Sequence, residues 1–190
     1  MKTGVGEGGY MLELGSFIGN SASTFARAMQ QKKLNATVVC MDTWLGDAFM
    51  WKAKDKWLGQ QGASGQPRLY EQFMINIVGH GVSELVLPVR TSATVGLRYL
   101  RSFIQTGELP PPGVIYLDAA HEYPETVLEI HLAWEVLKPG GYLVGDDYDA
   151  YWPSVQQSVN EFVLYMGFGE FASRHHVYRW AQHMDVQREL

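Results

Sequence analysis

Two adjacent carboxylates, Asp146 and Asp147, follow a short apolar run in the segment GYLVGDDY, residues 141–148. The run predicts a buried β-strand, which would place both side chains at the edge of an apolar core. Carboxylates in such a place repel each other and resist desolvation, so they are usually hydrated, hydrogen-bonded or facing a cation. Asp118 ends another apolar run, VIYLD, and His121 follows three residues later. An imidazole titrates near neutrality, so His121 is a candidate general base, with a helix-capping or loop-packing role as the alternative.

A second pattern lies earlier in the chain, where the run YMLEL continues into a turn that contains Gly15 and Gly19. Such a turn allows close approach of a ligand and opens a helix N-terminus. Asp42 ends the next apolar run, at a spacing that favours hydrogen bonds to a ribose. Phe17 stands where a dinucleotide-binding turn needs its middle glycine. The two turns together favour a nucleoside-containing ligand without a pyrophosphate.

Strand-like and helix-like runs alternate from end to end, and this order must position the residues above. The predicted strands cover residues 10–14, 36–42, 84–90, 114–118 and 141–147. Amphipathic helical segments between them predict a parallel sheet covered on both faces, with right-handed crossovers. Residues 169–176 and 177–183 predict two closing strands in an antiparallel pair. In such a sheet a ligand binds beyond the carboxyl ends of the strands, where the candidate residues are expected to meet.

Length and composition limit the remaining possibilities. A chain of 190 residues without a visible second domain predicts one domain, residues 1–190. The formal charge of −5 argues against nucleic acid as a partner. No apolar run reaches the length of a membrane span, and the N-terminal residues lack the apolar core of a signal peptide, so we expect no membrane partner and a cytoplasmic location.

The segment of residues 44–67 is the one irregular stretch of the chain. It contains three tryptophans and ends in a Gly/Ser/Gln-rich tail. It is too long for a simple connector, so it predicts a lid or a substrate-facing loop. A surface insertion that packs its own tryptophans is the alternative.

Four segments, ELGSFIGNSA, VVCMDTWLGD, PVRTSA and VIYLDAAHEYPETVLEIHLAWEVLKPGGYLVGDDY, carry a family resemblance in that order. They resemble class I S-adenosylmethionine-dependent methyltransferases over residues 10 to about 165. The similarity is closest to small-molecule O-methyltransferases with a D-x-x-H-x-Y segment before the fourth helix and a GG-hhh-DD-Y strand after it. The resemblance implies an α/β fold, a Rossmann-like three-layer sandwich whose mostly parallel seven-stranded sheet has an antiparallel last strand.

The resemblance also implies a role for the first strand ends. Glu13 and the turn from Gly15 through Ser16 to Gly19 would hold the methionine end of S-adenosylmethionine. Asp42 and Thr43 would bind the ribose, and the stretch Arg90-Thr91-Ser92 would lie near the adenine. These assignments place the cofactor across the first three strands.

For the later strand ends, the resemblance implies chemistry on the acceptor. Asp118, Asp146 and Asp147 match the positions that bind a divalent cation in metal-dependent relatives, and oxygen ligands suit Mg²⁺ or Ca²⁺ better than zinc. Asp118 is also expected to contact the cofactor and, with His121, to be catalytic. Methyl transfer from a sulfonium is an in-line displacement, so the enzyme must align a hydroxyl and make it more nucleophilic. We therefore predict an S-adenosylmethionine-dependent enzyme that methylates a hydroxyl of a small molecule, either with the assistance of a cation such as Mg²⁺ or by a metal-free mechanism based on His121.

The sequence departs from this family at its beginning. Family members usually have helices before the first strand, whereas here the first strand begins by about Tyr10. Either the chain is truncated, or the acceptor site is built from residues 44–67 and a second subunit of a homodimer. Two rival functions are a nucleotide-dependent oxidoreductase, which the missing pyrophosphate turn disfavours, and a cofactor-binding protein without catalysis.

Overall fold

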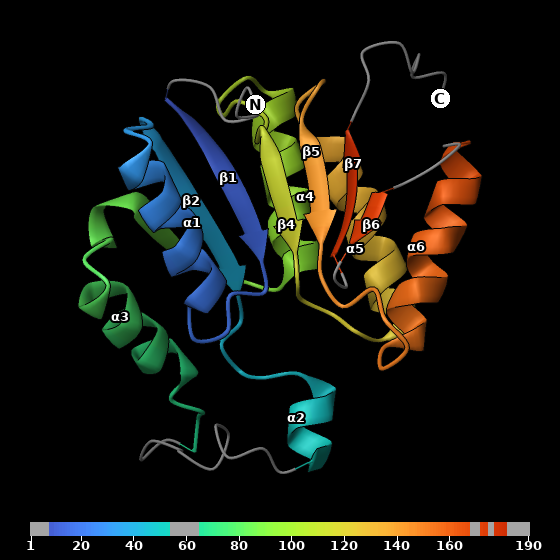
Figure 1. Ribbon diagram of the computed structural model, residues 1–190, viewed down its shortest axis with the longest axis horizontal. Helices are drawn as coiled ribbons and strands as arrows, with labels where there is room; N and C mark the ends of the chain where they lie inside the picture. The colour runs from blue at the N-terminus through green and yellow to red at the C-terminus, as the bar shows by residue number, and fades with distance from the viewer. Residues whose placement is uncertain (1–7, 54–64, 168–171, 175–176, 182–190) are drawn as a thin grey trace.

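The fold is known from a computed structural model that describes residues 8–53, 65–167, 172–174 and 177–181. Strands and helices alternate along most of the chain (Figure 1). Their bounds are β1 Gly9–Leu14, α1 Asn20–Gln31, β2 Ala36–Asp42, α2 Ala48–Ala53, α3 Leu69–Gly79, the 3-10 turn η1 Ser83–Leu85, β3 Val86–Arg90, α4 Ala93–Gln105, β4 Val114–Leu117, α5 Tyr123–Val136, β5 Tyr142–Gly145, α6 Pro153–Met166, β6 Ala172–Arg174 and β7 Val177–Ala181.

The strands form one sheet in the order β3-β2-β1-β4-β5-β7-β6. The pairs from β3 through β5 are parallel, whereas β7 pairs antiparallel with β5 and β6 pairs antiparallel with β7. The order reverses between β1 and β4, and ligands of such sheets bind at that point, beyond the carboxyl ends of the strands. The predicted α/β Rossmann-like fold with a parallel sheet is confirmed.

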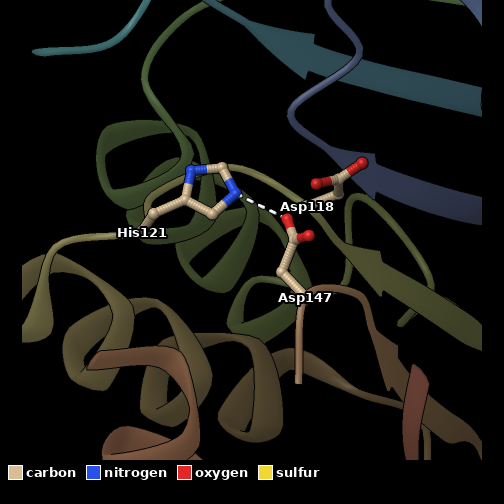
Figure 2. A group of neighbouring side chains, drawn as sticks. All are labelled: Asp118, His121 and Asp147. Carbon is tan, nitrogen blue, oxygen red and sulfur yellow. Dashed lines mark hydrogen bonds and ion pairs between the residues drawn. The ribbon is translucent and has the colours of Figure 1, made fainter. Parts of the chain in front are cut away.

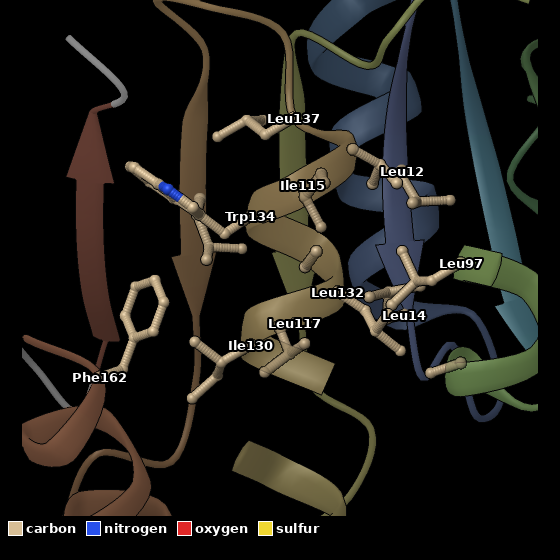
Figure 3. Close-up of a cluster of buried hydrophobic side chains, with 14 of the residues drawn as sticks. Leu12, Leu14, Leu97, Ile115, Leu117, Ile130, Leu132, Trp134, Leu137 and Phe162 are labelled. Atoms are coloured by element: carbon tan, nitrogen blue, oxygen red, sulfur yellow. The ribbon is translucent and has the colours of Figure 1, made fainter. Parts of the chain in front are cut away.

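Each face of the sheet has its own apolar core, because neighbouring side chains on a strand point to opposite faces. On β1, Leu12 and Leu14 pack with the core that includes α4, α5 and α6, whereas Met11 packs on the side of α1 and α3. The first core is drawn in Figure 3, where Phe162 of α6 lies beside Trp134 of α5. The sheet therefore lies between two helical layers that fix where its strands end.

Helix α5 forms one of the helical segments that the sequence predicts between the strands. Pro124 stands in its first turn, where the missing N–H costs nothing. None of the helices in the described part of the chain is long and apolar enough to cross a membrane. The predicted strand of residues 84–90 is shorter than expected, because residues 83–85 form a 3-10 turn before β3.

Residues 44–67 contain one short helix, α2, that the sequence did not predict. In Figure 1 the arrows of β1, β2, β4 and β5 end at the lower edge of the sheet, and α2 lies below that edge. Residues 46–50 line the cleft described below. Residues 54–64 lie outside the described residues, so a role of the whole segment as a lid stays a prediction.

Candidate functional site

A cleft of about 830 Å³ opens at the carboxyl ends of the parallel strands. This volume falls within the range of small-molecule sites, roughly 300–1,000 Å³. Ten of the predicted site residues line the cleft: Gly15, Ser16, Asp42, Thr43, Thr91, Ser92, Asp118, His121, Asp146 and Asp147. Glu13, near the end of β1, and Gly19, at the end of the glycine turn, do not line it. The cleft thus brings together most of the residues that the sequence singled out.

The turn after β1 needs glycine at position 15. Gly15 has a φ of 82°, which favours glycine, and a Cβ atom built there would lie 1.9 Å from the carbonyl oxygen of Asp118. The backbone of this turn therefore touches the end of β4 directly. This close approach joins the two halves of the cleft at the point where the strand order reverses.

Asp42 holds the same turn in place from the end of β2. Its Oδ2 accepts hydrogen bonds from the backbone N–H groups of Ser16 and Phe17, both at 2.8 Å. Its Oδ1 accepts a third from Trp44 N–H at 2.6 Å. A carboxylate offers about four acceptor positions, so one more hydrogen bond can be accepted at Asp42. The side chain is half-buried and lines the cleft.

Glu13 lies beneath the turn and is fully buried. Its Oε2 accepts hydrogen bonds from Ser16 Oγ at 2.6 Å and from Cys40 Sγ at 3.3 Å. Its Oε1 has no hydrogen-bond partner among the described residues. Burial raises the pKa of this carboxyl, an effect that its hydrogen bonds oppose. Glu13 is therefore placed to support the turn from below.

The residues expected near an adenine lie at the far side of the cleft. Thr91 and Ser92 line it, and Ser92 Oγ accepts a hydrogen bond from Val95 N–H at the start of α4. Arg90, in contrast, lies over the ring of Tyr70, 4.8 Å from its centroid. The side chain of Arg90 is thus engaged with α3.

Asp118, His121 and Asp147 form a tight group at the ends of β4 and β5 (Figure 2). Each offers one ligand atom, and these atoms all lie within 4.8 Å of one another. The shortest contact joins His121 Nε2 to Asp147 Oδ2 at 2.7 Å. Burial and the charges of Asp147 and Asp146 raise the pKa of Asp118 to about 7. A group of this kind offers two carboxylates and an imidazole to a cation.

Asp146 is not part of this group, although it was predicted to share a cation with Asp118 and Asp147. Its Oδ2 accepts a hydrogen bond from Tyr116 Oη at 2.6 Å, and its Oδ1 accepts one from Asp147 N–H at 2.9 Å. Asp147 has a left-handed backbone, with a φ of 63°, so the two neighbouring side chains diverge. The third member of the group is therefore His121, whereas the sequence predicted Asp146 in that place.

One aromatic side chain and several acidic side chains surround His121. Its ring stacks on Trp152, with centroids 4.1 Å apart and an angle of 24° between the planes. Its Nδ1 lies 3.8 Å from Asp47 Oδ2, a residue of the segment before α2. Burial alone lowers the pKa of His121, but the hydrogen bond and charge of Asp147, with the charges of Asp118 and Asp47, raise it overall.

Glu129 is a site residue that sequence reasoning missed. It lies on the buried face of α5, lines the cleft, and accepts a hydrogen bond from Ala120 N–H at 3.2 Å. Thr126, one turn earlier, donates to the carbonyl of Ala120 at 2.9 Å. Burial raises the pKa of Glu129 to about 7 against the effect of its hydrogen bond. The available signal was a glutamate between two apolar residues of this helix, Leu128 and Ile130, whereas Asp47 and Trp152 carried none.

Comparisons with known proteins agree with this fold. The O-methyltransferase NovP is similar over 92% of this chain and 72% of its own, with a TM-score of 0.64 and 16% identity. CalS11, a TDP-rhamnose 3′-O-methyltransferase of calicheamicin biosynthesis, is similar over 91% and 71%, with a TM-score of 0.60 and 18% identity. An O-methyltransferase from Bacillus cereus in complex with SAH is similar over 90% and 72%, with a TM-score of 0.57 and 14% identity.

At these identities the structures establish the fold. A search of curated protein sequences found no match. The family evidence comes from a methyltransferase domain model, Methyltransf_24, which matches residues 12–148 and so covers every strand end described above except β7 and β6. This match confirms the resemblance found in the sequence. The chain therefore belongs to the family of S-adenosylmethionine-dependent methyltransferase domains.

Proposed function

We propose that this enzyme methylates a hydroxyl group of a small molecule, with S-adenosylmethionine as the methyl donor. One observation carries the proposal: a single cleft joins the glycine turn and Asp42 to the group of Asp118, His121 and Asp147. The names of two structural neighbours, an O-methyltransferase and a TDP-rhamnose 3′-O-methyltransferase, support the choice of oxygen as the acceptor atom.

The cofactor half of the cleft would work through the residues around the glycine turn. Gly15 and Ser16 would face the methionine end, supported by the buried Glu13 and by Gly19. Asp42 would accept a hydrogen bond from one ribose hydroxyl, because three of its roughly four acceptor positions are filled by backbone N–H groups. Thr43, Thr91 and Ser92 would complete the ribose and adenine contacts. S-adenosylmethionine, when bound, supplies a methyl group made electrophilic by the sulfonium charge.

The second half of the cleft would prepare the acceptor. Asp118, next to the glycine turn, would orient the hydroxyl toward the donor. His121 Nε2 would take the proton of the hydroxyl group, which makes the hydroxyl oxygen a stronger nucleophile toward the methyl group. Because the pKa of His121 is raised, this nitrogen is free of a proton only at higher pH than in an ordinary histidine. Trp152 would exclude water from one face of the imidazole.

A divalent cation fits the same group. Asp118, His121 and Asp147 present ligand atoms close enough to share one ion, and burial together with the charges of Asp147 and Asp146 raises the pKa of Asp118. Mixed oxygen and nitrogen donors suit Mn²⁺ as well as Mg²⁺. A bound cation would supply positive charge that favours ionisation of the acceptor hydroxyl. Asp146 would not bind the cation itself but would hold the backbone of Asp147 by accepting a hydrogen bond from its N–H group.

The test is a transfer assay with methyl-labelled S-adenosylmethionine and a panel of hydroxylated sugars, phenols and polyketides, run with Mg²⁺, with Mn²⁺ and with EDTA. We expect label in an ether product, and we expect Asp118→Asn to bind SAH yet lose transfer. Transfer retained in EDTA would restrict the proposal to the metal-free route through His121. Label found only on nitrogen or carbon acceptors would overturn the choice of a hydroxyl.

A further inference from the structure

The side chains of the cleft carry an excess of negative charge. Among the described residues that line it, none is lysine or arginine, whereas eight are acidic: Asp42, Asp47, Asp118, Glu122, Glu125, Glu129, Asp146 and Asp147. The aspartates at the strand ends hold the turns or form the group around His121, and Asp47 accepts a hydrogen bond from Met50 N–H at the start of α2. The three glutamates of α5 have no part in the reaction proposed above.

These three glutamates share one face of α5. Glu122 immediately precedes the helix, Glu125 follows three residues later and Glu129 four residues after that, and side chains at this spacing are neighbours on a helix. Burial is the main cause of the raised pKa of Glu129, and the charges of Glu125 and Glu122 add to it. Glu125 is exposed, Glu122 is half-buried and Glu129 is 5% exposed. Together they form an acidic wall that runs from the surface into the cleft.

Helix stability explains only the outer part of the acidic wall. Carboxylates at the start of a helix interact favourably with its partial positive charge, which accounts for Glu122 and Glu125. Glu129 lies a turn deeper, where a second carboxylate four residues away is unfavourable. One of its oxygens accepts the hydrogen bond from Ala120 N–H, and the other has no hydrogen-bond partner in the described part of the chain. Because buried polar groups are normally paired, a ligand in the cleft is expected to supply the missing donor.

Two aromatic side chains line the same cleft. Phe49 packs edge-to-face against Trp152, with centroids 5.4 Å apart, and is 44% exposed. Trp152 stacks on His121, and Glu129 binds the N–H group of the residue before His121. The aromatic pair and the inner end of the acidic wall therefore both lie beside His121. This half of the cleft offers contact to a ring and, next to it, negative charge.

We propose that the cleft selects an acceptor that carries a protonated amine next to its hydroxyl-bearing ring, with the amine held by Glu125 and Glu129. The inference rests on the proposed function and names the substrate class of that site. An ammonium group has three N–H donors and no acceptor, so it can satisfy the free oxygen of Glu129. Its positive charge also relieves the repulsion along the acidic wall. Acceptors that carry phosphate or carboxylate groups are disfavoured, because like charges would face each other.

The test uses three phenols that differ mainly in the charge of one end group. Tyramine carries an ammonium group, tyrosol a neutral hydroxyl and para-hydroxyphenylacetate a carboxylate. Their dissociation constants would be measured by NMR titration of the SAH-bound protein in EDTA at pH 8, above the raised pKa of Glu129, which is about 7. We expect tyramine to bind at least about tenfold more tightly than tyrosol, and the carboxylate to bind most weakly. Equal constants for tyramine and tyrosol, or binding of none of the three, would overturn the proposal.

Two substitutions locate the amine. Glu125→Gln and Glu129→Gln each remove one charge from the acidic wall, and the glutamine at position 129 keeps an acceptor for Ala120 N–H. Glu71→Gln on α3, an exposed carboxylate outside the cleft, is the control. We expect each wall variant to weaken tyramine binding by at least about fivefold, with the affinities for tyrosol and SAH unchanged. Unchanged tyramine binding in both wall variants, or an equal loss of SAH affinity, would contradict the assignment.

Methyl transfer to the same phenols separates this inference from the proposed function. Label from S-adenosylmethionine should appear on the phenol oxygen of tyramine with a higher kcat/KM than on that of tyrosol, and Glu125→Gln should narrow the ratio. Equal kcat/KM for the two phenols would overturn the selection of a cationic acceptor. If no hydroxyl is methylated while tyramine still binds more tightly than tyrosol, the proposed function fails and the charge selection of the cleft remains.

Discussion

At the scale of residues, strained backbone gathers at the ends of the strands. Phe17, Trp44 and Asp147 are non-glycine residues with positive φ, and they follow β1, β2 and β5. Such conformations cost about 1–3 kcal/mol each and persist only when the surroundings impose them. The carboxylate of Asp42 binds the N–H groups of Phe17 and Trp44, and Asp146 binds that of Asp147. Two aspartates therefore stabilise all three strained turns of the cleft.

The close approach at Gly15 gives a prediction for stability. In Gly15→Ala the new Cβ would collide with the carbonyl oxygen of Asp118, in addition to the cost of a positive φ. Gly140→Ala is the matched control, because its φ of 78° is similar and nothing lies within 4 Å of the built Cβ. We expect the control to lose about 1–2 kcal/mol of unfolding free energy from the backbone alone. Gly15→Ala should lose at least about 2 kcal/mol more.

Urea unfolding followed by circular dichroism would measure this difference. Equal losses in Gly15→Ala and Gly140→Ala would mean that the contact between the glycine turn and β4 can relax without cost.

The buried carboxyl of Glu129 gives a prediction for pH dependence. Its pKa is raised from 4.5 to about 7, so the folded state holds the proton more tightly than the unfolded state. The free energy of unfolding must then fall as pH rises from about 4.5 to 7, and stay level above. For this single group the fall is on the order of 3 kcal/mol.

Glu129→Gln removes the titration and keeps an acceptor for Ala120 N–H. The difference in unfolding free energy between this variant and the wild type, measured from pH 4 to 8, isolates Glu129 from Asp118, which titrates in the same range. We expect the variant to gain relative stability as pH rises. A difference that does not change with pH would contradict the raised pKa.

The placement of the strand-end residues beside one cleft could be predicted from the sequence, whereas their hydrogen-bond partners could not. Asp42, Asp118 and Asp147 were predicted to face one site because the carboxyl ends of parallel strands share an edge. The diversion of Asp146 to Tyr116 depends on the left-handed backbone at Asp147, which the sequence did not indicate because residue 147 is not a glycine. Asp47 was missed because its contact with His121 joins segments 74 residues apart, 47 to 121, through a loop without periodicity.

At the scale of elements, α5 connects the apolar core to the cleft. Its N-terminal half holds the backbone of Ala120 through Thr126 and Glu129, and its C-terminal half packs Trp134 against Phe162 of α6. A displacement of α5 would therefore move the segment that carries His121. The helix was predictable from its proline start and apolar stripe, whereas α2 was not, because six residues are too few to establish a period.

The packing of α6 gives a prediction with a control on the same helix. Phe162 is 2% exposed, and its ring contacts both Trp134 and His131. Phe162→Ala should lower the free energy of unfolding by about 3–5 kcal/mol. Leu164→Ala, at a position 80% exposed, should change it by less than about 0.5 kcal/mol. Thermal unfolding of both variants would test this, and similar losses would mean that α6 does not rest on the core as described.

At the scale of the whole molecule, two apolar cores on opposite faces hold a sheet whose order reverses between β1 and β4. The βαβ alternation predicted that a ligand binds beyond the carboxyl ends of the strands, whereas the strand order was not predicted. The size of the cleft could not be predicted, because it depends on residues 46–50, which line the cleft and come from a segment without a regular sequence pattern. The fold thus follows from local patterns, whereas the acceptor side depends on long-range packing.

The central claim, that the cleft binds S-adenosylmethionine through the turn held by Asp42, is tested most directly by calorimetric titration with SAH. The wild type, Asp42→Asn and the exposed control Glu84→Gln would be titrated with Mg²⁺ and with EDTA. We expect one SAH per chain in the wild type and the control in both buffers, and at least a tenfold weaker affinity in Asp42→Asn, which corresponds to about 1.4 kcal/mol. Absence of binding in the wild type, or equal affinity in Asp42→Asn, would contradict the account.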